Sequence, residues 1–220
     1  ISDGTFQGEV FNYGTISDGT FQGEVYNHNT ISGGTFQGGE VYNVRGTISG
    51  GTFEKRMTLM NDGASITISD GLFKGEVSTG ICRFPLSISG GLFTKAVDVS
   101  HVYNPTDLSI TGGYFVSKPT VPNGSDIAFT SVSDQAGRTF QVPVNDDWSE
   151  NGYNELYVPS GSSEQPNTIT VKTAAPLTDC LAGDASIMDN VRTNADGSYT
   201  IDVHSPAPIV LVTEEPSAPP

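Results

Sequence analysis

The sequence predicts an all-β protein: a parallel β-helix, or β-solenoid, followed by a small β domain or cap. Three observations lead to this prediction. A six-residue motif, Ile-Ser/Thr-Asp/Gly-Gly-x-Phe, occurs seven times before Ser117. The spacing between successive copies grows from 15 to 22 residues while the motif itself stays fixed. Glycine supplies 26 of the 220 residues without a collagen period, which indicates many tight turns.

Each repeat is predicted to form one closed coil of three short strands, because 15 residues are too few for a strand and a helix. In the second repeat these strands are expected at Thr15–Ser17, Thr20–Gln22 and Glu24–Tyr26. Asp-Gly or Gly-Gly makes the turn after the first strand, and Gln-Gly makes the next turn. The third corner is expected to hold asparagines in the left-handed conformation: Asn12, Asn27 and Asn43.

One coil cannot bury its own apolar side chains, so the coils are expected to stack in parallel register about 4.8 Å apart. Side chains alternate along a strand, which places three columns inside. The isoleucine column is Ile1, Ile16, Ile31, Ile48, Ile68, Ile88 and Ile110. The phenylalanine column is Phe6, Phe21, Phe36, Phe53, Phe73, Phe93 and Phe115. The valine column is Val10, Val25, Val41, Val77 and Val97, with Met57 in the fourth coil.

The pattern stops after Phe115, and the Pro/Gly-rich segment 118–124 marks the expected boundary. Three parts are predicted: the solenoid at 1–124, a small all-β domain or cap at 125–213, and a Pro-rich linker beginning at 214–220. One short helix is expected near Leu177–Asn190. Strands are expected at Asp126–Val132, Arg138–Val144, Glu155–Val158, Thr168–Thr173, Ser198–Val203 and Pro208–Thr213.

Charge and cysteine content narrow the classes of function. A formal net charge of −15 argues against nucleic acid and anionic membrane as partners, and favours a charge-solubilised secreted protein. No apolar stretch approaches the roughly 20 residues of a membrane helix, so membrane insertion is not expected. Cys82 and Cys180 lie far apart and form neither a zinc nor a redox motif. Two buried free thiols are favoured over a disulfide.

The ISDGTF and ISGGTF repeats resemble those of parallel β-helix surface proteins of gut-dwelling Gram-positive bacteria. More distantly, they resemble the right-handed, pectate-lyase-like β-helices. The resemblance covers about Ile1–Ser117. It implies a right-handed helix, an extracellular location on the bacterial cell surface, and adhesion or glycan binding. Because the chain begins inside a repeat and ends in a Pro-rich segment, further coils upstream and further modules downstream are expected.

The candidate ligand-binding residues lie on the third strand of the first three coils. Alternation places one aromatic residue of each coil outside, next to the inward valine. Such exposed rings suit the apolar faces of sugars, or else form a ladder that only stabilises the sheet. Glutamates precede the valines and add carboxylates to the same face. The candidate set is Phe11, Tyr26, Tyr42, Glu9, Glu24 and Glu40.

A second set of carboxylates occupies the first turn of some coils: Asp3, Asp18 and Asp70. Columns of carboxylates offer the oxygen ligands that Ca²⁺ takes, so a calcium site stays open as a hypothesis. Turn chemistry is the favoured explanation, because Gly33 and Gly50 interrupt the column in neighbouring coils. No EF-hand loop or calcium-binding nonapeptide repeat is present. The three histidines stand alone and are expected to be surface or loop residues: His28, His101 and His204.

The predicted function is a non-catalytic surface module that binds a glycan or a host ligand. One alternative is a purely structural spacer. Another is a polysaccharide lyase, because lyases that resemble this fold pair acidic Ca²⁺ ligands with an Arg or Lys base. An ice-binding array is disfavoured because serine replaces threonine at many positions of the Thr/Ser face. The basic residues considered for a lyase site are Lys55, Arg56, Lys74, Arg83 and Lys95.

Overall fold

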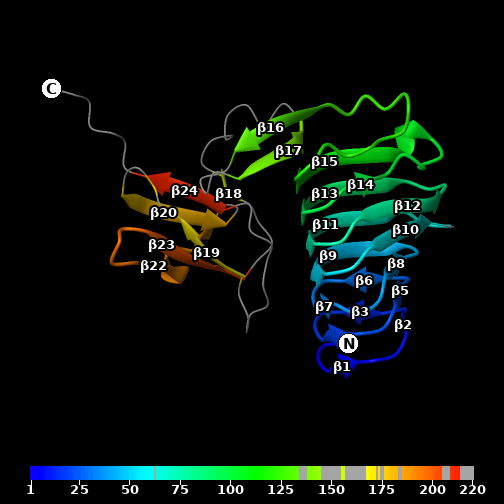
Figure 1. The fold of residues 1–220 in the computed structure, drawn as a ribbon, viewed down its shortest axis with the longest axis horizontal. Coiled ribbons are helices and arrows are strands. Elements are labelled where there is room, and N and C mark those ends of the chain that lie inside the picture. The colour runs from blue at the N-terminus through cyan, green and yellow to red at the C-terminus, as the bar shows by residue number, and fades with distance from the viewer. Residues whose placement is uncertain are drawn as a thin grey trace. The chain divides into compact units, whose positions relative to one another are not determined.

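The computed structural model shows a nearly all-β protein (Figure 1). It divides into two compact units, which are described separately: Ile1–Ser131 with Phe140–Asn145, and Val132–Thr139 with Asp146–Pro220. The first unit therefore extends past residue 124, where the sequence placed the boundary. The structure describes residues 1–61, 63–133, 138–144, 155–156, 167–171, 173, 176–182, 185–204 and 209–213. The predicted linker at 214–220 lies outside these residues.

The first unit is a parallel β-solenoid in which equivalent segments of successive repeats pair with one another. In the first three repeats the strands are two or three residues long, close to the three-strand coil expected from the sequence. These strands are β1 (Thr5–Phe6), β2 (Val10–Asn12), β3 (Thr15–Ile16), β4 (Thr20–Phe21), β5 (Val25–Asn27), β6 (Thr30–Ile31), β7 (Thr35–Phe36) and β8 (Val41–Asn43).

From the fourth repeat onward, the first two strands of each coil fuse into one bent strand. The turn glycines Gly51, Gly71, Gly91 and Gly113 keep a positive φ there, and the pairing register shifts at the same point. The fused strands are β9 (Gly46–Phe53), β11 (Ile66–Phe73), β13 (Leu86–Phe93) and β15 (Leu108–Phe115). The other side of these coils consists of β10 (Met57–Asn61), β12 (Val77–Cys82) and β14 (Val97–Asp98), and a 3₁₀ turn, η1 (Pro105–Asp107), precedes β15.

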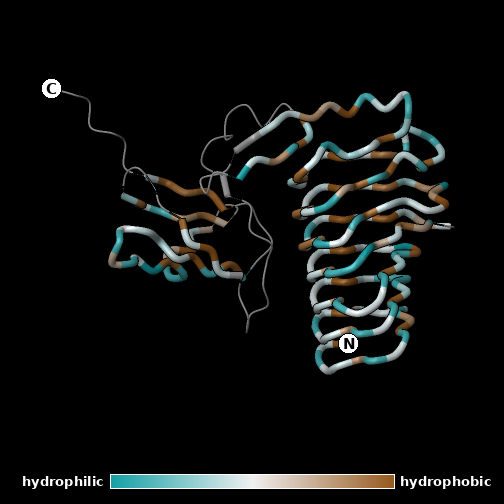
Figure 2. The backbone as a smooth tube through the Cα atoms, in the orientation of Figure 1, coloured by the Kyte–Doolittle hydropathy of each residue, from teal (hydrophilic) through white to brown (hydrophobic). Residues whose placement is uncertain are grey.

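Two parallel sheets run along the stack. One contains β1-β4-β7-β9-β11-β13-β15, joined by β3 and β6, and the other is β14-β12-β10-β8-β5-β2. Like residues face each other across coils, as in Phe21↔Phe36 and Val25↔Val41. The predicted parallel stack is therefore confirmed. Figure 2 shows the apolar positions recurring from coil to coil.

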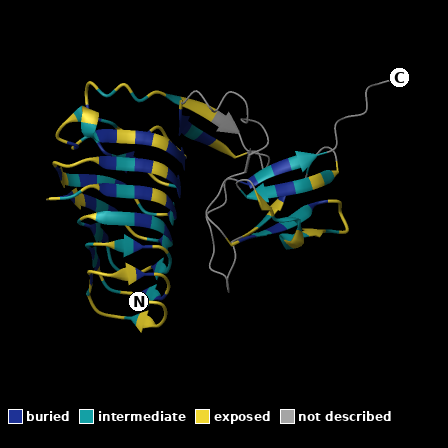
Figure 3. Ribbon diagram, turned by 180° about the vertical axis from the view of Figure 1, so that it is seen from behind, coloured by how far each residue is buried: buried dark blue, intermediate teal, exposed yellow. Residues whose placement is uncertain are grey.

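The three predicted columns form the core of the solenoid. Ile16, Phe21 and Val25 are fully buried, and Met57 fills the valine position of the fourth coil. The phenylalanine rings stack with centroids 4.5–5.0 Å apart and planes within 10° of parallel. Burial is less complete in the first coil, which lies at the end of the stack (Figure 3).

The expectation of left-handed asparagines at the third corner is wrong. No described residue other than glycine has a positive φ. Asn12, Asn27 and Asn43 instead end strands β2, β5 and β8 and are buried. The reason is strand parity: when Val25 points inward, Tyr26 points outward and Asn27 points inward again.

The buried asparagines form a ladder of side-chain amides. Nδ2 of Asn12 donates to Oδ1 of Asn27 at 2.6 Å, and Nδ2 of Asn27 donates to Oδ1 of Asn43 at 2.6 Å. The next coil places Leu59 opposite Asn43, so the ladder ends there. Among the described residues, Nδ2 of Asn43 is the one buried side-chain nitrogen or oxygen without a hydrogen-bond partner.

The last coil is covered mainly by residues of the same unit. Strand β17 (Thr139–Pro143) pairs antiparallel with β15 through Phe115↔Gln141, and β16 (Phe129–Ser133) lies next to it in the sheet. Phe129 meets the terminal ring of the phenylalanine column edge-on, at 6.0 Å from Phe115. Val121 and Ile127 also pack against the core. The cap predicted for the open end thus includes the hairpin that follows residue 124.

The second unit is built from two antiparallel sheets. One has the order β18-β24-β20-β21 and the other β19-β23-β22. Their core contains Val171, Cys180, Ile201, Val203, Ile209 and Leu211. The strands are β18 (Glu155–Leu156), β19 (Asn167–Val171), β20 (Leu177–Ala182), β21 (Ala185–Ser186), β22 (Val191–Thr193), β23 (Tyr199–Val203) and β24 (Ile209–Thr213).

The predicted helix near Leu177–Asn190 is wrong. That segment forms β20, β21 and a 3₁₀ turn, η2 (Met188–Asn190), because β20 pairs along its length with β24. The six predicted strand segments all overlap observed strands, although residues 157, 158, 172 and 208 lie outside the described residues. Across the described part of the chain, no helix has the length and apolar character needed to cross a membrane.

Candidate ligand-binding face

The structure places Phe11, Tyr26 and Tyr42 in one outward column. They occupy the middle positions of β2, β5 and β8 and face one another across coils. The ring centroids are 5.0 Å apart for Phe11 and Tyr26 and 4.7 Å apart for Tyr26 and Tyr42, with planes 12° and 11° from parallel. Phe11 is 54% exposed. The three aromatic residues expected to share a surface therefore do so.

The glutamates join this column through the tyrosine hydroxyls. The hydroxyl of Tyr26 donates to Glu24 Oε2 at 3.1 Å, and that of Tyr42 donates to Glu40 Oε2 at 3.3 Å. Glu40 also accepts a hydrogen bond from Thr58 and lies 3.8 Å from Nε of Arg56. Glu24 has no ion-pair partner among the described residues. The second and third coils thus each offer a carboxylate and a phenol as one unit, whereas the first coil has Phe11 at this position.

A second column, which sequence reasoning missed, runs beside the first. The imidazole of His28 stacks on Tyr13 with centroids 4.7 Å apart, and Tyr13 is 68% exposed. These residues lie two positions after Phe11 and Tyr26, in the bends that follow β2 and β5. The signal was present, because Tyr13 and His28 follow Asn12 and Asn27 at the same offset. Together, Phe11, Tyr13, Tyr26, His28 and Tyr42 are called the exposed aromatic face.

The rings of this face stack on one another, so each covers part of its neighbour's π surface. Near-parallel planes at centroid distances of 4.7–5.0 Å leave mainly ring edges and hydroxyls toward solvent. A flat platform for a sugar ring is therefore available only at the ends of the columns. The remaining surface is a ridge of ring edges with carboxylates beside it.

The phenols of Tyr26 and Tyr42 are expected to ionise above the ordinary tyrosine pKa of about 10. Partial desolvation raises both pKa values, and Glu24 and Glu40 raise them further by hydrogen bonding and charge repulsion. The neutral phenols therefore stabilise the fold below about pH 10, and this contribution is lost as the pH rises through the raised pKa.

An NMR titration of the tyrosine ring signals measures this effect. Glu24→Gln should lower the pKa of Tyr26. The matched variant is Glu54→Gln, which removes a carboxylate that pairs with Lys74 Nζ at 2.7 Å in the parent protein. This variant should leave the pKa of Tyr26 unchanged. Equal titration of Tyr26 in both variants would show that Glu24 does not act on the phenol.

The turn carboxylates behave as turn residues in the first two coils. Oδ1 of Asp3 accepts from the Gly4 amide at 2.6 Å, and Oδ1 of Asp18 accepts from the Gly19 amide at 2.7 Å. In the third coil a Cβ atom at Gly33 would lie 2.1 Å from the carbonyl oxygen of Ser17, which explains the missing carboxylate there. The described residues contain no group of three or more His, Cys, Asp or Glu side chains arranged to hold a metal ion.

Two of the basic residues considered for a lyase site have partners in neighbouring coils. Nζ of Lys74 lies 2.7 Å from Glu54 Oε1. The guanidinium of Arg56 donates to Ser78 Oγ at 2.9 Å and also faces Glu40. These contacts join successive coils across the solenoid surface.

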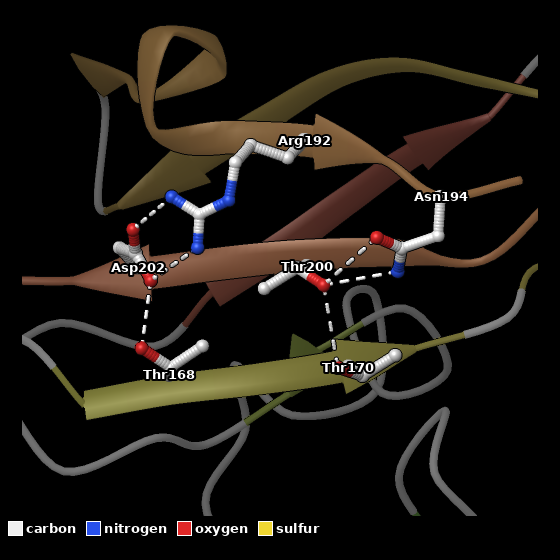
Figure 4. Close-up of polar contacts among 6 residues, drawn as sticks. All are labelled: Thr168, Thr170, Arg192, Asn194, Thr200 and Asp202. Atoms are coloured by element: carbon white, nitrogen blue, oxygen red, sulfur yellow. Dashed lines mark hydrogen bonds and ion pairs between the residues drawn. The ribbon is translucent and has the colours of Figure 1, made fainter.

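The second unit carries a polar network on β19, β23 and β22 (Figure 4). Arg192 holds Asp202 with two contacts, at 2.6 and 3.2 Å, and Thr168 donates to the same carboxylate at 2.7 Å. These hydrogen bonds lower the pKa of Asp202. Asn194 bonds to Thr200 at 3.0 Å. Because these side chains hydrogen-bond to one another across neighbouring strands, the network stabilises the sheet.

Both cysteines are buried free thiols, as expected from the sequence. Burial raises the pKa of Cys82 and of Cys180 to about 11. At about pH 8 the thiolate fraction should be roughly a hundredfold below that of an exposed cysteine. The folded protein is therefore expected to react very slowly with a thiol reagent such as Ellman's reagent. Two equivalents should react promptly in denaturant, and prompt reaction of the native protein would contradict the prediction.

Comparison of the chain with protein-family models finds no match, and comparisons with curated proteins and with solved structures find none either. The geometry of the first three coils is therefore the main guide to function. It combines a regular scaffold with two outward ring columns and a row of carboxylates. Among the described residues, no other surface repeats its side chains in this way with both aromatic and acidic character.

Proposed function

We propose that the protein is a non-catalytic, extracellular surface module that binds a glycan along the exposed aromatic face. The observation that carries this proposal is the pair of outward ring columns with glutamates hydrogen-bonded to the tyrosines. The resemblance of the repeats to those of bacterial surface β-helices supports the location. An adhesive role follows if the glycan belongs to a host or to another cell.

The chemistry of the face favours a neutral, hydroxyl-rich chain. Glutamate oxygens accept hydrogen bonds from sugar hydroxyls, and ring edges contact the apolar C–H groups between them. The repeat along the stack is about 4.8 Å, so an extended chain lying along the solenoid would meet the same groups in each coil. An acidic chain would be repelled by Glu9 and Glu24, because the net charge of the protein is −15.

The test is a glycan array followed by titration with the best neutral oligosaccharide. The double variant Tyr26→Ala, Tyr42→Ala is expected to lose binding by tenfold or more, about 1.4 kcal/mol. A matched control is Val116→Ala, an exposed apolar residue beyond the last solenoid strand. An array without any hits, or a double variant that binds like the parent, would reject the proposal.

The second candidate function is a structural spacer. One observation favours it: the rings of each column cover one another, which is the arrangement of a ladder that stabilises a sheet. A spacer predicts no glycan hits, together with a loss of stability in the Tyr26→Ala, Tyr42→Ala variant. The glycan array and a thermal melt of this variant therefore separate the two functions.

A further inference from the structure

A separate pocket lies at the corner that follows β12 and β14. Its backbone is fixed by contacts between coils. The amide of Tyr103 donates to the Cys82 carbonyl at 2.9 Å, and the amide of Arg83 donates to Oδ1 of Asn61 at 2.7 Å. The amide of His101 donates to Oγ1 of Thr79 at 3.3 Å. These hydrogen bonds fix the backbone from which the side chains of this corner project.

The pocket has a volume of about 260 Å³ and is lined by Gly80, Ile81, Cys82, Arg83, His101 and Tyr103. This is slightly below the range of about 300–1,000 Å³ that holds drug-sized ligands, so it suits a single small ring. Gly80 lies close to the preceding coil, because a Cβ atom there would be only 3.1 Å from Cγ of Met60.

Two of the lining side chains, Ile81 and Tyr103, present apolar surface and are strongly exposed. Ile81 is 64% exposed and Tyr103 is 85% exposed. Unlike Tyr26, Tyr103 stacks on no other ring among the described residues, so a face of its ring is open. An exposed tyrosine face beside an aliphatic side chain is a surface on which the apolar face of a sugar ring packs.

Arg83 supplies a positive charge to the lining of the pocket. Its guanidinium has neither an ion pair nor a hydrogen bond among the described residues, although the chain carries a net charge of −15. The carboxylate of Asp98 accepts hydrogen bonds from the amide and hydroxyl of Ser100, at 3.1 and 2.6 Å. Asp107 also lies near Cys82. Within this acidic surrounding, Arg83 is the cation available to a bound carboxylate.

We propose that this pocket binds a carboxylate-bearing sugar residue of an acidic glycan. The guanidinium of Arg83 pairs with the carboxylate, for which its planar fork of donors is suited. The ring of Tyr103 packs on the face of the sugar, and Ile81 contacts its apolar edge. The proposal does not depend on the exposed aromatic face, because it uses different residues in different coils.

The test is NMR titration of the whole protein with glucuronic acid, N-acetylneuraminic acid and glucose. One of the two acids is expected to bind at least about tenfold more tightly than glucose, and to shift signals of Ile81 and Tyr103. Which acid binds distinguishes a uronate from a sialate. Arg83→Gln should reduce that affinity by tenfold or more, and Tyr103→Ala should also weaken it. The matched control is Arg45→Gln, which replaces an exposed arginine of an earlier coil whose guanidinium has no ion pair or hydrogen bond among the described residues.

Three results would overturn the proposal. The first is binding of glucose as tight as that of both acids. The second is unchanged affinity in Arg83→Gln. The third is an equal loss in Arg45→Gln, which would indicate attraction to positive charge without a defined pocket. A thermal melt of each variant shows that the solenoid is intact. Retained acid binding in the Tyr26→Ala, Tyr42→Ala variant would separate this site from the exposed aromatic face.

Discussion

Replacing Phe53 with alanine is expected to lower the free energy of unfolding of the solenoid by about 3–5 kcal/mol. Phe53 is fully buried and stacks on Phe36 at 4.7 Å and on Phe73 at 4.9 Å. Removal of its ring leaves a cavity in the middle of the column and interrupts ring stacking on both sides. The coils of a solenoid contact mainly their nearest neighbours, so the interfaces on either side of the substitution should weaken most.

Urea unfolding followed by hydrogen exchange of individual amides measures this loss and distinguishes the first unit from the second. The matched control is Phe11→Ala, which removes a ring of the same size from the exposed column. Because Phe11 is outside the core, its loss should cost about 1 kcal/mol or less. Equal losses in the two variants would contradict an inward phenylalanine column and an outward Phe11.

Identity at matched offsets was the feature that made the solenoid predictable. A column such as Phe21, Phe36 and Phe53 arises only if coils stack in register, and the same offsets located the outward tyrosines. Asparagine is common in turns, and this preference alone predicts a corner for Asn27, whereas strand parity carried on from Tyr26 predicts an inward side chain. Parity applied one residue farther would have placed Asn27 in the core.

Other features depend on contacts that do not recur from coil to coil, so the repeat pattern does not predict them. The variable position of the motif changes from threonine to Leu92 and Tyr114 in the last coils, where both residues are buried and Tyr114 meets Phe140 edge-on at 5.5 Å. The strand β20 depends on pairing with β24, about 30 residues later in the chain. The pocket near Arg83 arises where the connections differ in length, so no offset pointed to it.

The sequence left two alternatives open for the outward rings, a sugar-binding surface and a ladder of stacked rings. The sequence places Phe11, Tyr26 and Tyr42 on one surface, but the orientation of each ring depends on packing against the next coil. That orientation changes the expected ligand contact from ring faces to ring edges with carboxylates. The function proposed for the face therefore relies on Glu24 and Glu40 as much as on the tyrosines.

Replacing Asn27 with alanine is expected to lower the free energy of unfolding of the first unit by about 2–4 kcal/mol, because hydrogen bonds are lost in the core and a buried amide is left unpaired. Asn27 accepts from Asn12 and donates to Asn43, both at 2.6 Å. Asn12 keeps a second acceptor, the carbonyl of Thr30 at 3.0 Å. Asn43 has no second hydrogen-bond partner to keep, since its Nδ2 is already without one.

The double variant Asn27→Ala, Asn43→Ala provides the decisive comparison. Once Asn27 is absent, Asn43 is a buried amide with an unpaired donor and an unpaired acceptor, so its removal should cost little or restore stability. The two substitutions should therefore be strongly non-additive, with the double variant about as stable as Asn27→Ala or more stable. Urea unfolding measures all three variants. Simple addition of the two single losses would show that the asparagines act separately, and that the ladder does not couple the first three coils.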